Sequence, residues 1–147
     1  MDTILLIHGP NLNNLGKRDP AHYGAQTLSD IESLVGAEAQ KVGCAVKAFQ
    51  SNHEGALIDF LQKESASASG IIINPGALTH YGYSLHDALA DTQLPVVEVH
   101  LSDIEAREEW RRVSVIKPAC IGQISGKKEA GYIEALALLA KHLGKSV

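Results

Sequence analysis

Residues 71–76 read Ile-Ile-Ile-Asn-Pro-Gly, a run of β-branched apolar residues that stops abruptly at a turn. An uninterrupted apolar run of this kind is typical of a strand that is buried on both faces, as the strands of parallel sheets are. Residues 3–7 form a similar run, and residues 96–99 form another. Together with the apolar segments 44–50 and 120–124, they predict five strands.

The segments between these strands carry helical signals. Three of them begin with a capping box, in which a Ser or Thr and an acidic residue three positions later bond to each other's backbone. The pairs are Thr27 with Asp30, Ser51 with Glu54, and Ser102 with Glu105. Two further helices are predicted over residues 84–91 and 130–143.

The alternation of strands and helices predicts the fold class. Parallel strands need long crossovers that are usually helical, so the pattern indicates an α/β fold with a parallel sheet. Five strands in one domain over residues 1–147 fit a flavodoxin-like three-layer sandwich. The strand order expected for that fold is 2-1-3-4-5.

Composition narrows the classes of function. The chain has 13 basic and 17 acidic side chains, a formal net charge of −4, whereas nucleic-acid surfaces need clustered positive charge. We therefore expect no nucleic-acid partner. The apolar run at residues 4–7 is too short for a membrane span or a signal peptide, and Cys44 and Cys120 have neighbours typical of buried free thiols in a reducing compartment. These features predict a cytoplasmic protein with no membrane partner.

Polar side chains gather in the loops that follow the predicted strands. In open α/β sheets, ligands bind beyond the carboxyl ends of the strands, where the strand order reverses. Here that point lies between the first and third strands, whose following loops span residues 8–24 and 74–80. The fourth strand brings Glu98 and His100 to the same edge. Four arginines follow the first and fourth strands, namely Arg18, Arg107, Arg111 and Arg112.

Each of these residues also has an explanation that needs no function. Asn11 and Asn74 are common turn residues, Glu98 and His100 could share the solvent face of an edge strand, and the arginines could pair with glutamates on a solvated helix face. Together, however, amide, imidazole, phenol and guanidinium groups from three loops would meet in one cleft. That cleft suits a small, oxygen-rich anion, with a helix N-terminus near Ser102 as a seat for a carboxylate. Neither a metal cluster nor an activated nucleophile accompanies these groups, which favours proton transfer by tyrosine and histidine.

At this level of detail the motifs resemble those of the type II 3-dehydroquinate dehydratase family. The matching stretches run in order along nearly the whole chain: Gly9-Pro10-Asn11-Leu12-Asn13 with Leu15-Gly16, Arg18-Asp19-Pro20, Tyr23-Gly24, Gln50-Ser51-Asn52-His53-Glu54-Gly55, Asn74-Pro75-Gly76-Ala77 with Thr79-His80, Glu98-Val99-His100-Leu101-Ser102, Arg107-Glu108 with Arg111 and Ser114, Gly122-Gln123-Ile124-Ser125-Gly126 and Gly131-Tyr132. The resemblance implies an anti elimination of water from 3-dehydroquinate through an enol or enolate, giving 3-dehydroshikimate. That reaction serves the shikimate and quinate pathways. The resemblance also implies no cofactor, no metal, and a homo-oligomer, a dodecamer built from trimers.

The resemblance further implies a role for individual residues in catalysis. Tyr23 would remove the proton beside the ketone, and Arg18 would keep that phenol ionised. Asn11 would help to stabilise the charge of the enolate. His100 would protonate the departing hydroxyl, with Glu98 orienting its ring.

A second group of residues is implied in substrate binding. Its members are Asn74, His80, Asp87, Leu101, Ser102 and Arg111. Leu101 and Ser102 would hold the substrate carboxylate, and the amide, imidazole and guanidinium groups would bind the ring hydroxyls. Asp87 would reach the site of a neighbouring subunit.

Some positions depart from the family's usual residues, and none of them removes an implied catalytic group. They are His8, Asn14, Gly82, His86 and Asp103. His8, at the end of a predicted strand, is interpreted as a structural residue.

Other proteins share this fold class, and the sequence disfavours them. A response-regulator receiver domain needs an Asp at the end of the third strand, where this chain has Asn74. A flavin mononucleotide binder needs a hydroxyl-rich loop after the first strand, and this loop offers Pro and Asn. An inactive relative would have no need of Tyr23, Arg18 and His100 together.

Overall fold

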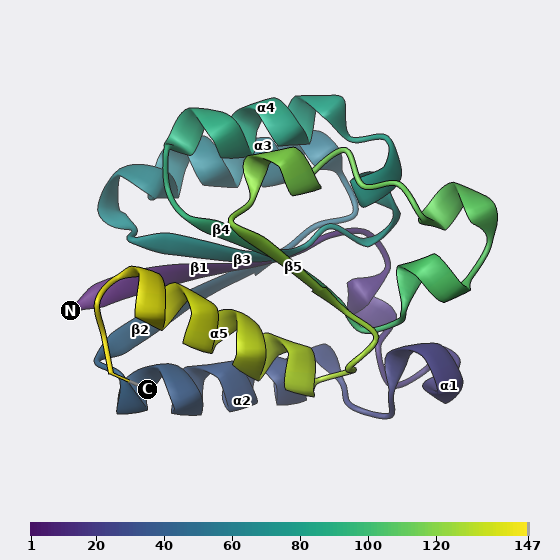
Figure 1. The fold of residues 1–147 in the computed structure, drawn as a ribbon, viewed down its shortest axis with the longest axis horizontal. Helices are drawn as coiled ribbons and strands as arrows, with labels where there is room; N and C mark the ends of the chain where they lie inside the picture. The colour runs from purple at the N-terminus through teal and green to yellow at the C-terminus, as the bar shows by residue number, and fades with distance from the viewer. Residues whose placement is uncertain (147) are drawn as a thin grey trace.

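Five parallel strands form one central sheet in the computed structural model, which describes residues 1–146 (Figure 1). The strands are β1 (Asp2–His8), β2 (Cys44–Gln50), β3 (Gly70–Asn74), β4 (Val96–His100) and β5 (Gly122–Ser125). Their order in the sheet is β2-β1-β3-β4-β5, all parallel. The predicted order and the α/β class are thus confirmed.

Helices cover both faces of this sheet, which makes three layers (Figure 1). The covering helices are α2 (Leu28–Lys41), α3 (Glu54–Glu64), α4 (Tyr83–Thr92) and α5 (Ala130–His142), and the short α1 (Pro20–Tyr23) lies beyond the carboxyl ends of the strands. Helices α2 and α5 lie on one face, and α3 and α4 lie on the other. Within residues 1–146, no helix is long and apolar enough to cross a membrane.

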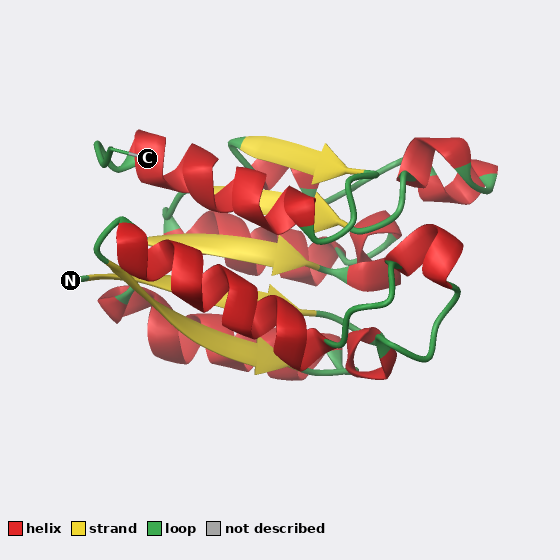
Figure 2. Ribbon diagram, turned by 90° about the horizontal axis from the view of Figure 1, so that it is seen from below, coloured by secondary structure: helices red, strands yellow, loops and turns green. Residues whose placement is uncertain are grey.

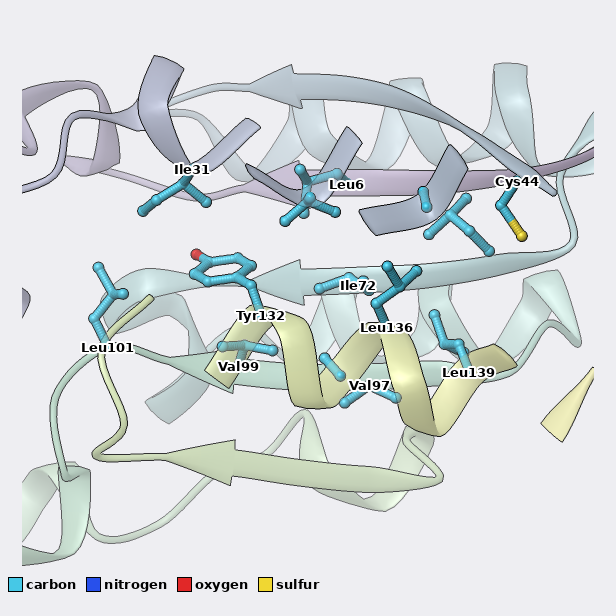
Figure 3. Close-up of a cluster of buried hydrophobic side chains, with 14 of the residues drawn as sticks. Leu6, Ile31, Cys44, Ile72, Val97, Val99, Leu101, Tyr132, Leu136 and Leu139 are labelled. Carbon is cyan, nitrogen blue, oxygen red and sulfur yellow. The ribbon is translucent and has the colours of Figure 1, made fainter. Parts of the chain in front are cut away.

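The apolar runs of β1 and β3 are continuous because each strand contributes to two cores. Along β1, Leu6 faces α2 and α5, whereas Leu5 and Ile7 belong to the cluster under α3 and α4. Ile72 of β3 likewise lies in the first core, which Figure 3 shows between the sheet and helix α5. Burying a side chain of this size stabilises the fold by about 1.5–3 kcal/mol. Both faces of these strands therefore demand apolar residues.

The first predicted capping box is present at the start of α2. The Thr27 hydroxyl accepts from the backbone N–H of Asp30 at 3.1 Å, and the Asp30 carboxylate accepts from the backbone N–H of Thr27 at 3.0 Å.

The second predicted capping box is wrong. His53, not Ser51, is the N-cap of α3, and the Ser51 hydroxyl accepts from the His53 N–H at 3.0 Å within a tight turn. The Glu54 carboxylate accepts from the backbone N–H of Leu85 in α4 at 3.0 Å. Glu54 thus bonds to the backbone of a neighbouring helix instead of the backbone at the start of its own helix.

The third predicted capping box and its helix are also wrong. After β4 the chain forms short 3-10 turns, η4 (Ile104–Ala106) and η5 (Glu109–Arg111). Asp103, not Ser102, caps the first of them by accepting from the N–H of Glu105 at 3.0 Å. Ser102 instead faces the side chain of Arg107. A three-residue turn has too few aligned peptide groups for a helix dipole, so the predicted carboxylate site at a helix N-terminus is wrong.

The last strand begins later than expected. Residues 117–119 form a further 3-10 turn, η6 (Lys117–Ala119), and Cys120 follows it with its thiol directed to the carbonyl of Ile116. Strand β5 therefore starts at Gly122.

Candidate active site

A pocket opens beyond the carboxyl ends of the strands, at the predicted position. Figure 2 shows the strands running in one direction, with the short helices and loops gathered at one end and both termini at the other. Nine of the predicted site residues line this pocket: Asn11, Arg18, Tyr23, Asn74, His80, His100, Leu101, Ser102 and Arg111. Asn74 and His100 are the last residues of β3 and β4, and the segments that follow β1, β3 and β4 supply the others. Arg107 lines the pocket as well.

Glu98 and His100 form a buried hydrogen-bonded pair behind the pocket. They project from the same face of β4, and His100 Nε2 lies 2.5 Å from Glu98 Oε2. Burial raises the pKa of Glu98, but the hydrogen bond and charge of His100, with the hydroxyls of Thr79 and Ser114, lower it more, so that it lies below its usual value. Strand β4 lies between β3 and β5, so the alternative of an exposed edge strand is wrong.

Two arginines meet at the phenol of Tyr23. Arg18 stacks on the ring, with Cζ 3.7 Å from the ring centroid. Arg107 donates from Nη1 to the phenol oxygen at 2.7 Å and to the Ser102 hydroxyl at 3.3 Å. The sequence pattern had placed Arg107 on a solvated helix face, and only its position within a matching motif could have singled it out. Arg107 thus puts positive charge against the phenol oxygen, and Arg18 puts it over the face of the ring.

The Asn74 side chain is held from two sides. Its Nδ2 donates to the hydroxyl of Tyr132 at 3.2 Å, and its Oδ1 accepts from the N–H of Gly76 at 3.0 Å. Tyr132 projects from α5, with its hydroxyl directed toward the carboxyl ends of the strands (Figure 3). The β1 loop comes very close here, since a Cβ on Gly9 would lie 2.3 Å from the carbonyl oxygen of Pro75.

Asn11 has a left-handed backbone, with φ of 71°. That conformation is uncommon outside glycine and needs support from its surroundings. The Asn52 carboxamide accepts from the Asn11 N–H at 3.0 Å. Gln50 in turn donates to Asn52 and to the carbonyl of Gly9, each at 3.2 Å. The matching stretch that starts at Gln50 thus supports the first loop rather than lining the pocket.

His80 and Arg111 meet at Trp110. The His80 ring is edge-on to the Trp110 ring and its Nδ1 lies 2.7 Å from the carbonyl oxygen of Val113. Burial lowers the pKa of His80 below its usual value. Arg111 stacks on Trp110 at 4.1 Å and pairs with the Glu108 carboxylate at 2.8 Å.

Asp87 lies outside this pocket. It is exposed on α4 and its carboxylate lies 3.0 Å from Nδ1 of His86. Its role at the site of a neighbouring subunit stays a prediction. Among residues 1–146, no three His, Cys, Asp or Glu side chains are grouped so that they could hold a metal ion.

His8 is buried beside the site. It pairs with Asn74 in the sheet register and its ring lies 6.5 Å from that of Tyr132, centroid to centroid. Neither ring nitrogen has a hydrogen-bond partner in the described part of the chain. Burial lowers the pKa of His8 to about 4, so the ring is neutral at pH 7.

The fold and the pocket together define a doubly wound α/β enzyme with acid–base groups at its switch point. The family model described as "Dehydroquinase class II" matches residues 2–140. A 3-dehydroquinate dehydratase from Roseiflexus castenholzii is 55% identical over 136 residues, which cover 92% of this chain and 87% of the relative. The chain belongs to the class II dehydroquinase family. Its enzyme class is that of the type II 3-dehydroquinate dehydratases, which are hydro-lyases.

Solved structures agree with this assignment. The crystal structure of a type II dehydroquinase from Butyrivibrio crossotus has a TM-score of 0.91 and 43% identity, covering 94% of this chain and 97% of that one. A type II dehydroquinase from Propionibacterium acnes also has a TM-score of 0.91, at 35% identity, covering 96% of this chain and 97% of that one.

Proposed function

We propose that this chain, folded as one domain, dehydrates 3-dehydroquinate to 3-dehydroshikimate by an anti elimination through an enolate. The observation that carries the proposal is the meeting of a phenol, Tyr23, and a carboxylate-paired imidazole, His100, in one pocket rich in guanidinium and amide groups. The former can accept a proton from carbon and the latter can give one to oxygen.

Tyr23 acts as the base in this proposal. Its phenolate takes the proton beside the ketone, and the electron pair of the broken C–H bond becomes the enolate. Positive charge favours the phenolate, and Arg107 contacts the phenol oxygen directly while Arg18 stacks on the ring. We therefore assign the support of the phenolate to both arginines rather than to Arg18 alone.

His100 acts as the acid. It gives a proton to the departing hydroxyl, which leaves as water, and the enolate electrons form the new carbon–carbon double bond. Glu98 orients the ring through its hydrogen bond with Nε2. Asn11 supplies a polar contact to the enolate oxygen, a preorganised role whose loss costs roughly 3 kcal/mol in comparable oxyanion sites.

The remaining pocket residues bind the substrate. The backbone N–H groups of Leu101 and Ser102 hold the carboxylate, and the side chains of Asn74, His80 and Arg111 hold the ring hydroxyls. Asp87, which is exposed on α4, completes the site of a neighbouring subunit in a dodecamer built from trimers. The reaction belongs to the shikimate or quinate pathway, in the cytoplasm, and uses no cofactor.

The first test is a dehydration assay with purified protein that has been treated with chelator and with borohydride. Absorbance from the conjugated enone should grow with 3-dehydroquinate as substrate, because no metal and no imine takes part. Tyr23→Phe should lower kcat by about 100-fold or more while a ring-carboxylate analogue still binds. Tyr83→Phe, at an exposed position on α4, is the matched control and should retain activity. A folded protein without activity would point to an inactive relative.

A further inference from the structure

The buried carboxylate of Glu98 has more hydrogen-bond partners than orienting one imidazole requires. Besides His100, the hydroxyl of Ser114 lies 2.8 Å from Oε1 and 3.0 Å from Oε2. The hydroxyl of Thr79 bonds to Oε2. Thr79 lies in the 3-10 turn η3 (Gly76–His80), and Ser114 lies in the segment after η5. Neither belongs to the catalytic or substrate-binding groups above.

The direction of these hydrogen bonds follows from counting donors and acceptors. The Ser114 oxygen already accepts from the backbone N–H groups of Ile116 at 3.2 Å and Lys117 at 3.0 Å. Both of its lone pairs are therefore used, and its single proton is free to be donated to Glu98. Thr79 is fully buried, and within residues 1–146 its hydroxyl makes hydrogen bonds only with Glu98 and, at 3.4 Å, with Ser114. Both hydroxyls can thus donate to the carboxylate.

A carboxylate that accepts two hydroxyl protons is stabilised in its ionised form. An ionised Glu98 has no proton to give to His100, so the proton between them must sit on Nε2 of the ring. The other ring nitrogen, Nδ1, makes no hydrogen bond within residues 1–146 and is not among the buried, unpartnered atoms. His100 lines the pocket, so Nδ1 is the nitrogen left to meet a ligand.

We propose that Thr79 and Ser114 are positioning residues that keep Glu98 ionised and thereby hold a proton on Nε2 of His100. Nδ1 is then the atom that carries the exchanged proton: it gives that proton to the leaving hydroxyl and takes another from solvent. In the opposite arrangement, Glu98 would be protonated and would donate to Nε2, and a neutral ring would carry its proton on Nδ1. The inference rests on the role proposed for His100 in the dehydration.

The test removes each hydroxyl with little change of shape and then restores it. Thr79→Val and Ser114→Ala delete the two donors, and Thr79→Ser and Ser114→Thr keep a hydroxyl at each position. Ser69→Ala is the matched control, because the Ser69 hydroxyl donates to the Asp2 carboxylate at 2.6 Å at the opposite end of the sheet.

The first readout is the position of the proton on His100, measured by nitrogen-15 NMR of histidine-labelled protein without substrate at a pH where the ring is neutral. The signal is assigned by its loss in His100→Asn. We expect the proton on Nε2 in the unsubstituted protein and in the control, and a partial transfer to the Nδ1 form in Thr79→Val and Ser114→Ala. A ring that carries its proton on Nδ1 in the unsubstituted protein overturns the proposal.

The second readout is the dehydration rate. We expect kcat to fall about tenfold or more in Thr79→Val and Ser114→Ala, with KM within about twofold, because a hydrogen bond to a charged group is lost away from the substrate. The hydroxyl-bearing variants should recover most of kcat, and Ser69→Ala should not change it. The Ser114 hydroxyl also accepts from the backbone N–H groups of Ile116 and Lys117, so Ser114→Ala can disturb that turn. In that case the comparison of Thr79→Val with Thr79→Ser is the test, because Val has nearly the shape of Thr. Equal kcat in Thr79→Val and Thr79→Ser refutes the proposal.

The two readouts separate this inference from the proposed function. If the unsubstituted protein does not dehydrate 3-dehydroquinate, or if His100→Asn keeps its rate, the proposed function fails. The NMR measurement still reports whether the hydroxyls set the proton on His100, because it needs no substrate.

Discussion

The buried ring of His8 predicts that mild acid destabilises this protein in a way that one substitution removes. His8 is fully buried in β1 and neither ring nitrogen has a hydrogen-bond partner in residues 1–146. Burial lowers its pKa from the ordinary value of 6.5 to about 4. The unfolded chain, in which the ring is in water, therefore takes up a proton at a higher pH than the folded protein does.

The sign and size of the effect follow from this difference. Lowering the pH reduces the free energy of unfolding wherever the unfolded state binds more protons than the folded state. For His8 this loss begins as the pH drops below 6.5 and is complete below about 4. One pKa unit corresponds to about 1.4 kcal/mol, so the complete loss is about 3 kcal/mol. At pH 5.0 roughly 2 kcal/mol of it has been lost relative to pH 7.5.

The assay is urea unfolding at pH 7.5 and pH 5.0 at one fixed protein concentration, since assembly makes apparent stability depend on concentration. His8→Asn removes the titrating ring. His142→Asn, at an exposed position on the last turn of α5, is the matched control. The loss between the two pH values should be about 2 kcal/mol smaller in His8→Asn than in the unsubstituted protein and in the control. The control also loses one histidine, but an exposed one, and the three proteins share all other titratable groups, so the comparison isolates the burial of His8.

An equal loss in all three proteins would refute the reasoning. It would mean that the His8 ring finds a hydrogen-bond partner, such as an ordered water, that supports its charged form. If the unfolding free energy fell more in His8→Asn than in the unsubstituted protein between pH 7.5 and pH 5.0, the predicted sign of the His8 contribution would be wrong.

Three further predictions concern the site and its frame. Arg107→Ala should lower kcat, because it removes the guanidinium that donates to the Tyr23 phenol oxygen; an unchanged kcat in the dehydration assay would contradict a role for that contact. Tyr132→Phe removes the oxygen that accepts from the Asn74 amide, so KM should rise about fivefold while the fold stays intact. An unchanged KM would contradict the proposal that Tyr132 positions Asn74 for substrate binding. Gly9→Ala forces a methyl group into the neighbouring loop and should cost about 3 kcal/mol of unfolding free energy; unchanged denaturation would show that the loops can separate.

Local patterns were sufficient for the sheet and for most of the pocket. The run at residues 71–73 and the similar run in β1 indicated strands buried on both faces, and burial of this kind requires helices on each side. Once the strand order is known, every loop at the carboxyl ends is placed at one edge of the sheet. The loop after β1 and the residues at the end of β4 were therefore predictable as neighbours.

Contacts between distant segments decided the rest. Glu54 has the spacing of a capping residue, yet it caps α4 rather than its own helix, because Leu85 lies within reach only in the folded protein. Arg107 has the spacing of a solvated helix face, yet it contacts Tyr23, which is 84 residues away in the sequence.

The same distinction holds behind the pocket. A carboxylate two residues before a histidine on one strand is visible in the sequence as Glu98 and His100, because a strand repeats every two residues. The hydroxyls of Thr79 and Ser114 lie 19 and 16 residues away from Glu98, in segments with no periodic pattern. Both positions belong to the stretches that match the family, but the match gives neither of them a role. The sequence by itself determined which groups could do chemistry here, since strand periodicity and buried apolar runs are local properties. Only the tertiary structure decided which protons those groups hold, because hydrogen bonds to a buried charge depend on side chains that folding alone brings together.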